Sequence, residues 1–189
     1  MKKIAVFASG SGSNAENIFR HFEGSDVARV ELILTNRADA GVLERAIRLG
    51  VDTKVFGRDA FYDSDDVVGL LHAYGIDYVV LAGFLWLVPE NLVRAYGGRM
   101  VNVHPALLPR HGGKGMYGDR VHKAVVEAGD IRTGITIHKV NEAYDSGDVI
   151  AQYSVAVEPG DTPERVAEKV HALEYEYFPK VIEQEIRKL

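Results

Sequence analysis

Three polar residues in the second half of the sequence carry the side chains that an acyl transfer needs: the amide of Asn102, the imidazole of His104 and the carboxylate of Asp145. Asn102 and His104 are two residues apart, so on an extended strand their side chains point to the same face. Pro105 favours an extended backbone at His104. We therefore expect the apolar run Met100 to Val103 to be a strand that delivers both side chains to its carboxyl end, where open α/β sheets bind ligands.

Each of these groups has a distinct task in such a reaction. When an amine attacks a formyl or acyl carbon, the intermediate bears an oxyanion that the N–H of Asn102 can stabilise, and losing one such donor typically lowers the rate about 10²–10³-fold. His104 titrates near neutral pH and can act as general acid or base. Asp145 is expected to stabilise the imidazolium or to hold a water that shuttles the proton. Asp-Ser-Gly (145–147) is also common in turns.

A glycine-rich segment near the N-terminus, Ser9 to Asn14, follows a short apolar run and precedes a helical pattern. Glycine lets the backbone approach a ligand closely, and a helix start presents free N–H groups and the positive end of the helix dipole. Ser11, Ser13 and Asn14 add hydroxyl and amide donors, which exceed what a tight turn without a ligand requires. We therefore predict that this loop binds a phosphate group.

The same loop also fits a loose dinucleotide-binding pattern through Gly10, Gly12 and Ala15. A site for NAD requires an acidic residue at the end of the second strand, whereas this chain has Thr35-Asn36-Arg37 there. NAD is therefore disfavoured, and Arg37 keeps an NADP-dependent oxidoreductase open as an alternative from a different class of enzyme. A monophosphate fits the residues of the loop better.

Short β-rich runs alternate with helical patterns along the chain, which is typical of a mainly parallel sheet with crossover helices. Asp39 is expected to cap the second helix and Gly50 to end it, and Pro179 is expected to kink or break the last helix. The predicted fold class is α/β: an open, twisted, mainly parallel sheet of about seven strands with helices on both faces, Rossmann-like, in a single domain (1–189). Strands are expected at 4–8, 30–35, 53–56, 78–81, 100–104, 134–139 and 149–157, and helices at 14–22, 40–49, 61–74, 89–96, 121–127 and from Thr162 onward.

The composition excludes several classes of function. The 189 residues include no cysteine, so disulfides, thiolate nucleophiles and cysteine-ligated metal sites are excluded, in agreement with a reducing compartment such as the cytoplasm. No apolar run approaches the length of a membrane span, and the N-terminal apolar run is too short for a signal peptide. The net charge of −5 argues against a nucleic-acid partner. We expect small-molecule substrates, no membrane partner and no metal.

Taken together, three motifs resemble those of the folate-dependent formyltransferase family. The run Asn102 to Pro109 (Asn-Val-His-Pro-Ala-Leu-Leu-Pro) resembles its first signature, and Gly134 to His138 with Asp145 to Gly147 and Ile150 to Gln152 is similar to its second. The opening Ser-Gly-Ser-Gly-Ser-Asn resembles the branch that acts on glycinamide ribonucleotide in purine synthesis. The likeness covers nearly the whole chain. It implies transfer of the formyl group of 10-formyltetrahydrofolate, as cosubstrate, to the amino group of 5′-phosphoribosylglycinamide.

The resemblance also implies which residues form the site. The catalytic asparagine, histidine and aspartate of the family fall on Asn102, His104 and Asp145, and its ribonucleotide contacts fall on Gly12, Ser13, Asn14, His171 and Glu174. Its folate contacts fall on Arg58, Leu85, Trp86, Leu87, Val88, Asn102, Asn141, Glu142, Ala143, Tyr144 and Asp145. The residues alone would instead place His171 and Glu174 on an exposed helix face.

Two features depart from many members of that family. Leu85-Trp86-Leu87 stands where many members carry a basic residue, so we expect Trp86 either in the core or in the wall of the pterin pocket. The loop 112–118 is longer and richer in glycine than in some members. It is expected to be a mobile lid that excludes water, a disordered surface loop, or both.

Other enzymes of the same fold that use formyl folates stay open as alternatives. Methionyl-tRNA formyltransferase adds a carboxyl-terminal nucleic-acid-binding domain, and formyltetrahydrofolate deformylase adds a regulatory domain before the core. We expect neither, because the 189 residues begin with the first strand and stop after the last helix. A catalytically inactive nucleotide-binding module is a further alternative. A homodimer is compatible with the sequence, which does not determine the oligomeric state.

Overall fold

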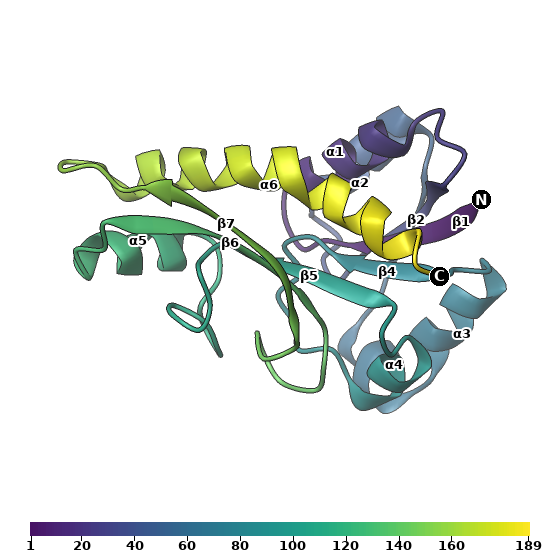
Figure 1. Cartoon of the computed structure of the whole chain (residues 1–189). Helices are drawn as coiled ribbons and strands as arrows, with labels where there is room; N and C mark the ends of the chain where they lie inside the picture. The colour runs from purple at the N-terminus through teal and green to yellow at the C-terminus, as the bar shows by residue number, and fades with distance from the viewer.

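Seven strands form one twisted sheet in the computed structural model of the chain, which describes residues 1–189 (Figure 1). Their order is β3-β2-β1-β4-β5-β6-β7. Every neighbouring pair from β3 to β5 is parallel, whereas β6 runs antiparallel to both β5 and β7. The predicted mainly parallel sheet of about seven strands is therefore confirmed. The strands are β1 (Lys2–Phe7), β2 (Ala28–Thr35), β3 (Asp52–Val55), β4 (Tyr78–Leu81), β5 (Met100–His104), β6 (Arg132–Lys139) and β7 (Val149–Ala156).

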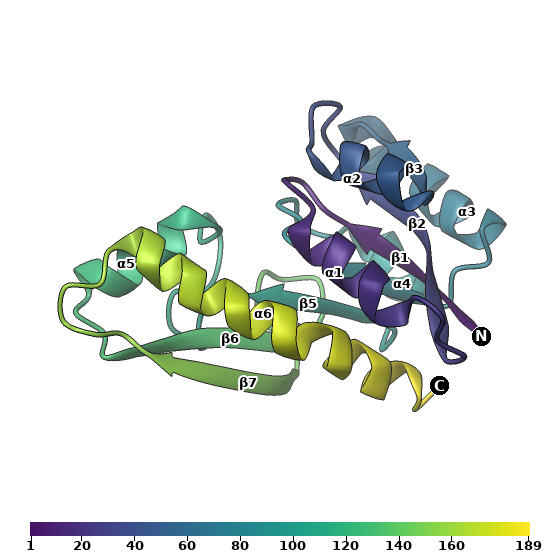
Figure 2. The ribbon, with the colours of Figure 1, turned by 90° about the horizontal axis from the view of Figure 1, so that it is seen from above.

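Helices cover both faces of this sheet, as predicted (Figure 2). One face packs against α1 (Ser13–Phe22), α2 (Val42–Leu49), α5 (Asp119–Glu127) and α6 (Pro163–Ile186) around a core of 26 buried residues. The other face packs against the π-helical turn η1 (Asp59–Asp63), α3 (Asp66–Ala73) and α4 (Glu90–Ala95) around a core of 15 buried residues. The central strands are therefore buried on both sides, and the polar loops leave the sheet at the carboxyl ends of its parallel strands.

Helix α6 continues through Pro179 as one helix to Ile186, so the predicted break at this proline is wrong. Proline has no N–H to donate to the carbonyl four residues earlier, which is that of Tyr175. The side chain of Asn17 on α1 donates to this carbonyl instead, at 2.9 Å. The neighbouring helix thus supplies a donor for the carbonyl that the proline leaves unpaired, and α6 continues along the sheet.

The predicted helix 61–74 is divided into η1 and α3. Ser64 interrupts it with an extended backbone (φ −146°, ψ 173°), and its hydroxyl accepts a hydrogen bond from the N–H of Asp66 at 3.2 Å. Ser side chains compete for backbone groups in this way and favour helix starts over helix interiors. Phe61 in η1 and Val67 in α3 still pack into the same core.

The start of α2 is fixed by the glycine-rich loop rather than by Asp39. The carboxylate of Asp39 pairs with Arg37 at 2.9 Å and caps nothing, so the predicted cap is wrong. The N–H of Val42 donates instead to the carbonyl of Gly10 at 3.1 Å. The helix ends as predicted at Gly50, which has a left-handed backbone (φ 68°).

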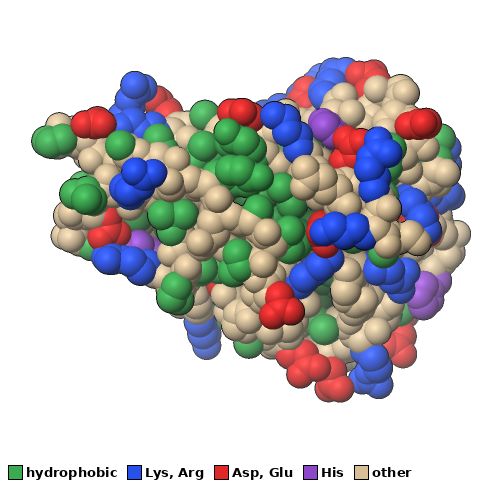
Figure 3. Space-filling view, in the orientation of Figure 1, with side chains coloured by type: hydrophobic (Ala, Val, Ile, Leu, Met, Phe, Trp, Pro, Cys, Tyr) green, Lys and Arg blue, Asp and Glu red, His purple; other side chains and the backbone are tan.

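Hydrophobic side chains reach the surface where α6 lies beside β7 (Figure 3). Tyr153 of β7 and Tyr177 of α6 stack there, with ring centroids 3.8 Å apart and planes 7° from parallel. On the face shown, basic and acidic side chains are interspersed around this region. None of the helices is both long enough and apolar enough to span a bilayer.

Candidate active site

A cleft of about 610 Å³ opens at the carboxyl ends of β1, β4 and β5. Its walls come from the loops that follow these strands, the loop 113–120, the turn 140–145 and one face of α6. Two of the predicted site residues, Arg58 and Glu142, do not line it. Those that do are Gly12, Ser13, Asn14, Leu85, Trp86, Leu87, Val88, Asn102, His104, Asn141, Ala143, Tyr144, Asp145, His171 and Glu174.

The side chain of Asn102 is oriented by a histidine on the neighbouring strand. Strand pairing places His138 of β6 opposite Asn102 of β5. Asn102 Nδ2 lies 3.0 Å from His138 Nε2, and His138 Nδ1 lies 2.8 Å from the carbonyl oxygen of Lys139. Because a carbonyl oxygen only accepts, His138 Nδ1 carries the proton and Nε2 accepts from the amide. One N–H of Asn102 is thus engaged, and the second is free for a ligand in the cleft.

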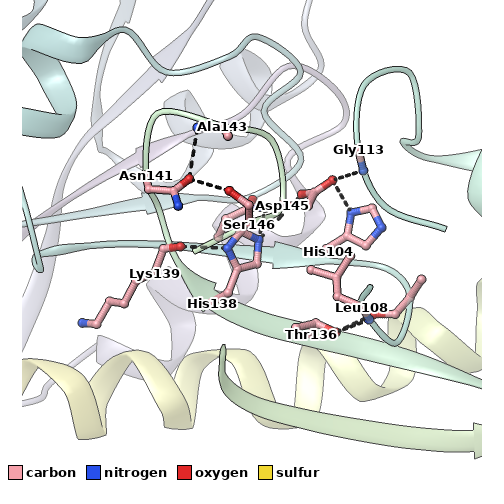
Figure 4. A network of polar contacts seen from close by, with 12 residues as sticks. His104, Leu108, Gly113, Thr136, His138, Lys139, Asn141, Ala143, Asp145 and Ser146 are labelled. Atoms are coloured by element: carbon pink, nitrogen blue, oxygen red, sulfur yellow. Dashed lines mark hydrogen bonds and ion pairs between the residues drawn. The ribbon is translucent and has the colours of Figure 1, made fainter. Parts of the chain in front are cut away.

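His104 is only 3% exposed, and each of its two ring nitrogens has a polar neighbour in the protein. Nε2 lies 2.8 Å from the carbonyl oxygen of His111, and Nδ1 lies 3.4 Å from Asp145 Oδ2 (Figure 4). The carbonyl requires a proton on Nε2, so Nδ1 is the nitrogen that can take up another proton. An imidazolium formed in this way lies directly beside a carboxylate.

Asp145 belongs to the turn between β6 and β7, and its left-handed backbone (φ 52°) directs the carboxylate toward His104 (Figure 4). Its Oδ2 accepts a hydrogen bond from the N–H of Gly113 at 3.0 Å, and its Oδ1 lies 3.7 Å from His138 Nε2. The turn requires glycine at position 147, because a Cβ there would lie 1.7 Å from the carbonyl oxygen of Lys139. The structure thus brings the amide, the imidazole and the carboxylate together.

Burial and charge set the protonation of this group. Burial lowers the pKa of the His104 imidazole, and the nearby Asp145 and the hydrogen bond to the His111 carbonyl offset this only in part. Burial would raise the pKa of the Asp145 carboxyl, but His138, His104 and the N–H of Gly113 lower it overall. Near neutral pH the arrangement is therefore a neutral imidazole beside a carboxylate, which suits a general base. No three His, Asp or Glu side chains are grouped so that they could hold a metal ion.

The glycine-rich loop meets α6 at another part of the cleft. Gly12 caps α1 with a left-handed backbone (φ 76°). Asn14 Nδ2 donates to Glu174 Oε2 at 2.7 Å, and His171 Nδ1 lies 3.1 Å from the same oxygen. The hydrogen bond with Glu174 raises the pKa of His171. Glu174 is only 4% exposed, which differs from the exposed helix face that its sequence context alone suggests.

Two buried polar atoms in this part of the cleft have no partner in the protein: Asn14 Oδ1 and His122 Nδ1. His122 lies on α5, with its ring centroid 6.1 Å from that of His171. Burial lowers the pKa of His122 and favours its neutral form. Because buried polar atoms are nearly always hydrogen-bonded, these two are candidates for contacts with a bound polar ligand.

Trp86 belongs to the core and to the wall of the cleft at once. Its ring centroid lies 5.7 Å from that of Phe61 and 6.1 Å from that of Phe56, within the second core. It also lines the cleft, next to Leu85. The guanidinium of Arg58 lies over the indole, 5.0 Å from its centroid. Arg58 therefore reaches the site through Trp86 rather than by lining it.

Sequence reasoning did not single out His138, Thr136 or His122 as site residues. His138 contacts Asn102. Thr136 does not line the cleft, but its hydroxyl donates to the carbonyl of Ala106 at 2.7 Å, two residues after the end of β5. One signal points to the first two: Thr136 and His138 alternate with isoleucine, so they share one face of a strand whose other positions are apolar. Nothing local in the sequence distinguishes His122 from a polar helix residue.

Comparison with known proteins shows which family has this fold. A family model described as formyl transferase matches residues 2–182. The chain belongs to the formyl transferase family. Among its solved relatives, the crystal structure of glycinamide ribonucleotide transformylase 1 from Symbiobacterium toebii is 35% identical and has a TM-score of 0.90, covering 100% of this chain and 89% of that chain. The formyltransferase fold predicted from the sequence is therefore confirmed.

Two curated relatives illustrate the range of similarity within the formyl transferase family. Phosphoribosylglycinamide formyltransferase of Bacillus subtilis is 33% identical over 189 residues, which are 97% of this chain and 94% of the relative. The chloroplastic phosphoribosylglycinamide formyltransferase of Arabidopsis thaliana is 45% identical over 187 residues, which are 96% of this chain. The chain spans only 64% of the length of this plant relative.

Proposed function

We propose that this chain transfers the formyl group of 10-formyltetrahydrofolate to the amino group of 5′-phosphoribosylglycinamide. One observation carries the proposal: the amide of Asn102, the imidazole of His104 and the carboxylate of Asp145 meet in a cleft that also contains a glycine-rich helix start and an aromatic wall. A helix start suits the phosphate of the ribonucleotide. The wall with Trp86 suits the flat pterin. The names of the curated and solved relatives support the ribonucleotide as the acceptor of a formyl group.

In the proposed reaction the amine nitrogen attacks the formyl carbon, and the electrons of the carbonyl double bond move to its oxygen. The free N–H of Asn102 donates to this oxyanion. His104 Nδ1 takes the proton from the attacking nitrogen, directly or through a water held by Asp145. The resulting imidazolium is stabilised by Asp145 and returns the proton to the departing folate nitrogen as the carbon–nitrogen bond breaks. Formylated ribonucleotide and tetrahydrofolate leave, and His104 is neutral again.

We assign the two substrates to different parts of the cleft. Gly12, Ser13 and Asn14 would bind the ribonucleotide phosphate, with His171 and Glu174 contacting its sugar or amide. The folate would lie along Leu85 to Val88 and along the turn from Asn141 to Asp145. Arg58 would support Trp86 from outside the cleft, and Glu142 does not line the cleft. The unpaired Asn14 Oδ1 and His122 Nδ1 support a polar ligand near the loop.

The test is turnover of the two substrates by the purified chain. We expect formation of tetrahydrofolate that depends on glycinamide ribonucleotide, with Asn102→Ala and His104→Ala each lowering kcat about 10²-fold or more while ribonucleotide affinity stays nearly unchanged. Inorganic phosphate should compete with the ribonucleotide and not with the folate. No turnover under these conditions, or phosphate competition against the folate alone, contradicts the assignment.

Changing the acceptor in this assay, together with a binding titration, separates the alternatives. Water as sole acceptor tests for a deformylase, initiator methionyl-tRNA tests for the tRNA enzyme, and titration with NADPH tests for an oxidoreductase. Tight binding of NADPH without binding of folate would overturn the proposal. A homodimer is compatible with the sequence, and sedimentation with and without substrates measures the oligomeric state.

A further inference from the structure

Behind the catalytic histidine lies a second histidine–carboxylate pair, His111 and Asp130. His111 belongs to the loop after β5, and Asp130 to the connection between α5 and β6. His111 Nε2 lies 2.7 Å from Asp130 Oδ2, and both side chains are largely buried, with 15% and 12% exposed. Arg110 binds the other oxygen of Asp130. Neither His111 nor Asp130 lines the large cleft, so the pair does not contact the substrates directly.

The backbone of His111 is left-handed, with φ 53°. This conformation is uncommon for residues other than glycine and is unfavourable unless the surroundings impose it. The contact with Asp130 anchors the side chain of His111 to a segment outside the loop. The anchored side chain therefore offsets part of the cost of the left-handed backbone.

This backbone conformation presents the His111 carbonyl to the catalytic histidine. Its oxygen accepts from His104 Nε2 at 2.8 Å. Two residues further along the same loop, the N–H of Gly113 donates to Asp145 Oδ2 at 3.0 Å. One loop thus contacts both members of the His104–Asp145 pair, and its shape determines how the imidazole and the carboxylate face each other.

We propose that His111 and Asp130 are positioning residues: their contact holds the His111 carbonyl against His104 Nε2, which keeps the proton on Nε2 and leaves Nδ1 as the catalytic nitrogen beside Asp145. The expected effect of the two residues on rate rests on the proposed function, whereas their expected effect on the tautomer of His104 does not. Without the carbonyl, a neutral His104 would also place a proton on Nδ1, because the only remaining acceptor is the Asp145 carboxylate. In that tautomer Nδ1 cannot take a proton from the substrate amine.

Four variants test the proposal. His111→Val is disfavoured in the left-handed region because it is β-branched, and Asp130→Ala removes the anchor. His111→Asn is the conservative variant, since asparagine tolerates that region and its amide can donate to Asp130. Glu90→Gln is the matched control, because it neutralises a carboxylate of the exposed pair with Arg94 on α4, outside the cleft. Circular dichroism and thermal unfolding show that each variant folds, and Asp130→Leu, which likewise offers no acceptor to His111, replaces Asp130→Ala if the latter does not.

The first readout is the tautomer of His104, measured by ¹⁵N–¹H NMR of the ligand-free protein and assigned with His104→Gln. We expect a single Nε2–H tautomer in the wild type, Glu90→Gln and His111→Asn, and a mixture in His111→Val and Asp130→Ala. The second readout is kinetic: kcat falls about tenfold or more in the latter two, with KM for the ribonucleotide changed less than about twofold. A single Nε2–H tautomer in His111→Val and Asp130→Ala, or a mixed one with unchanged kcat, overturns the proposal. If the wild type turns over no acceptor, the proposed function is wrong, and the tautomer still decides whether the pair positions His104.

Discussion

Asn102 Nδ2 lies 3.0 Å from His138 Nε2 across the antiparallel pair β5 and β6. The pair depends on the one reversed strand of the sheet, because β6 faces β5 in the register that sets these two residues opposite each other. The carbonyl of Lys139 determines which nitrogen of His138 carries the proton, and His138 in turn determines which end of the Asn102 amide faces it. The orientation of the amide is thus fixed before any substrate binds.

Removing the acceptor of this hydrogen bond should lower turnover. In His138→Leu the Asn102 amide loses its partner and can rotate, so we expect kcat to fall about tenfold or more while KM for the folate changes little. In His138→Gln a side-chain carbonyl can still accept from Asn102, so most of the activity should remain. Steady-state kinetics of the two variants checks this, and equal loss in both would show that His138 does not act through Asn102.

The sequence predicts the fold well because the central strands are buried on both faces and read as short apolar runs separated by helical patterns. Asn102 and His104 are predictable as neighbours, since spacing by two on a strand is a local property. Asp145 is different: its place beside His104 depends on the reversal of β6 and on a turn that needs Gly147. Its residue type makes it a candidate, but no local spacing places it beside His104. Long-range geometry of this kind leaves no periodic pattern in the sequence.

Other features depend on contacts that no side-chain pattern records. The His111 carbonyl that binds His104 is a backbone group, so residue types do not reveal it. The continuity of α6 through Pro179 depends on Asn17, which comes from α1 at the other end of the chain. Residues other than glycine usually avoid a left-handed backbone, and proline usually ends a helix. Tertiary contacts allow an exception to each rule, at His111 and at Pro179, and the sequence predicts only the rules.

The activity should fall on the acidic side as His104 becomes protonated. Burial lowers the pKa of His104, so the neutral, active form persists below the ordinary pKa of histidine. The carboxylate of Asp145 raises the pKa of His104 and opposes the effect of burial. In Asp145→Asn the acidic limb of kcat/KM should therefore move to lower pH, while the maximal rate falls because the imidazolium is no longer stabilised. A pH–rate profile of both proteins measures the two effects, and a limb that moves to higher pH contradicts the assignment.

Stability should also depend on pH through the buried histidines. Burial lowers the pKa of His104 and His122 in the folded protein, so below about pH 6.5 the unfolded chain takes up protons that the folded chain does not. The contribution of these groups to the free energy of unfolding is fully present above that pH. It is lost as the pH falls towards the pKa that the groups have in the folded protein. His171, with its raised pKa, has the opposite effect.

His122→Gln isolates one of these contributions. The variant lacks a titrating group at this site, so its free energy of unfolding should fall less steeply than that of the wild type as the pH decreases below about 6.5. Denaturant unfolding at several pH values measures the difference. Parallel curves for the two proteins would show that His122 is not responsible for the dependence.

Gly12 and Gly10 form a matched pair in the glycine-rich loop. A Cβ on Gly12 would lie 2.4 Å from Val42 Cγ2 and 2.7 Å from Val42 Cα, at a positive φ, whereas a Cβ on Gly10 would meet nothing within 4 Å. Gly12→Ala should therefore lower the free energy of unfolding by about 1–3 kcal/mol and weaken binding of the ribonucleotide, because α2 and the loop must move apart. Gly10→Ala should leave the free energy of unfolding nearly unchanged. Denaturant unfolding of both variants provides the test, and equal stability would mean that the loop accommodates a side chain at Gly12.

Trp86 is the only tryptophan of the chain, so its fluorescence reports on one wall of the cleft. A pterin that packs near the indole should quench this emission, whereas the ribonucleotide, placed by the proposal at Gly12 to Asn14, should leave it nearly unchanged. Titration of the two substrates separately measures both responses. Trp86→Phe keeps an aromatic ring against Phe61 and should retain turnover, while Trp86→Ala removes the wall and should raise KM for the folate more than it lowers kcat. Quenching by the ribonucleotide and not by the folate would reverse the assignment of the two ends of the cleft.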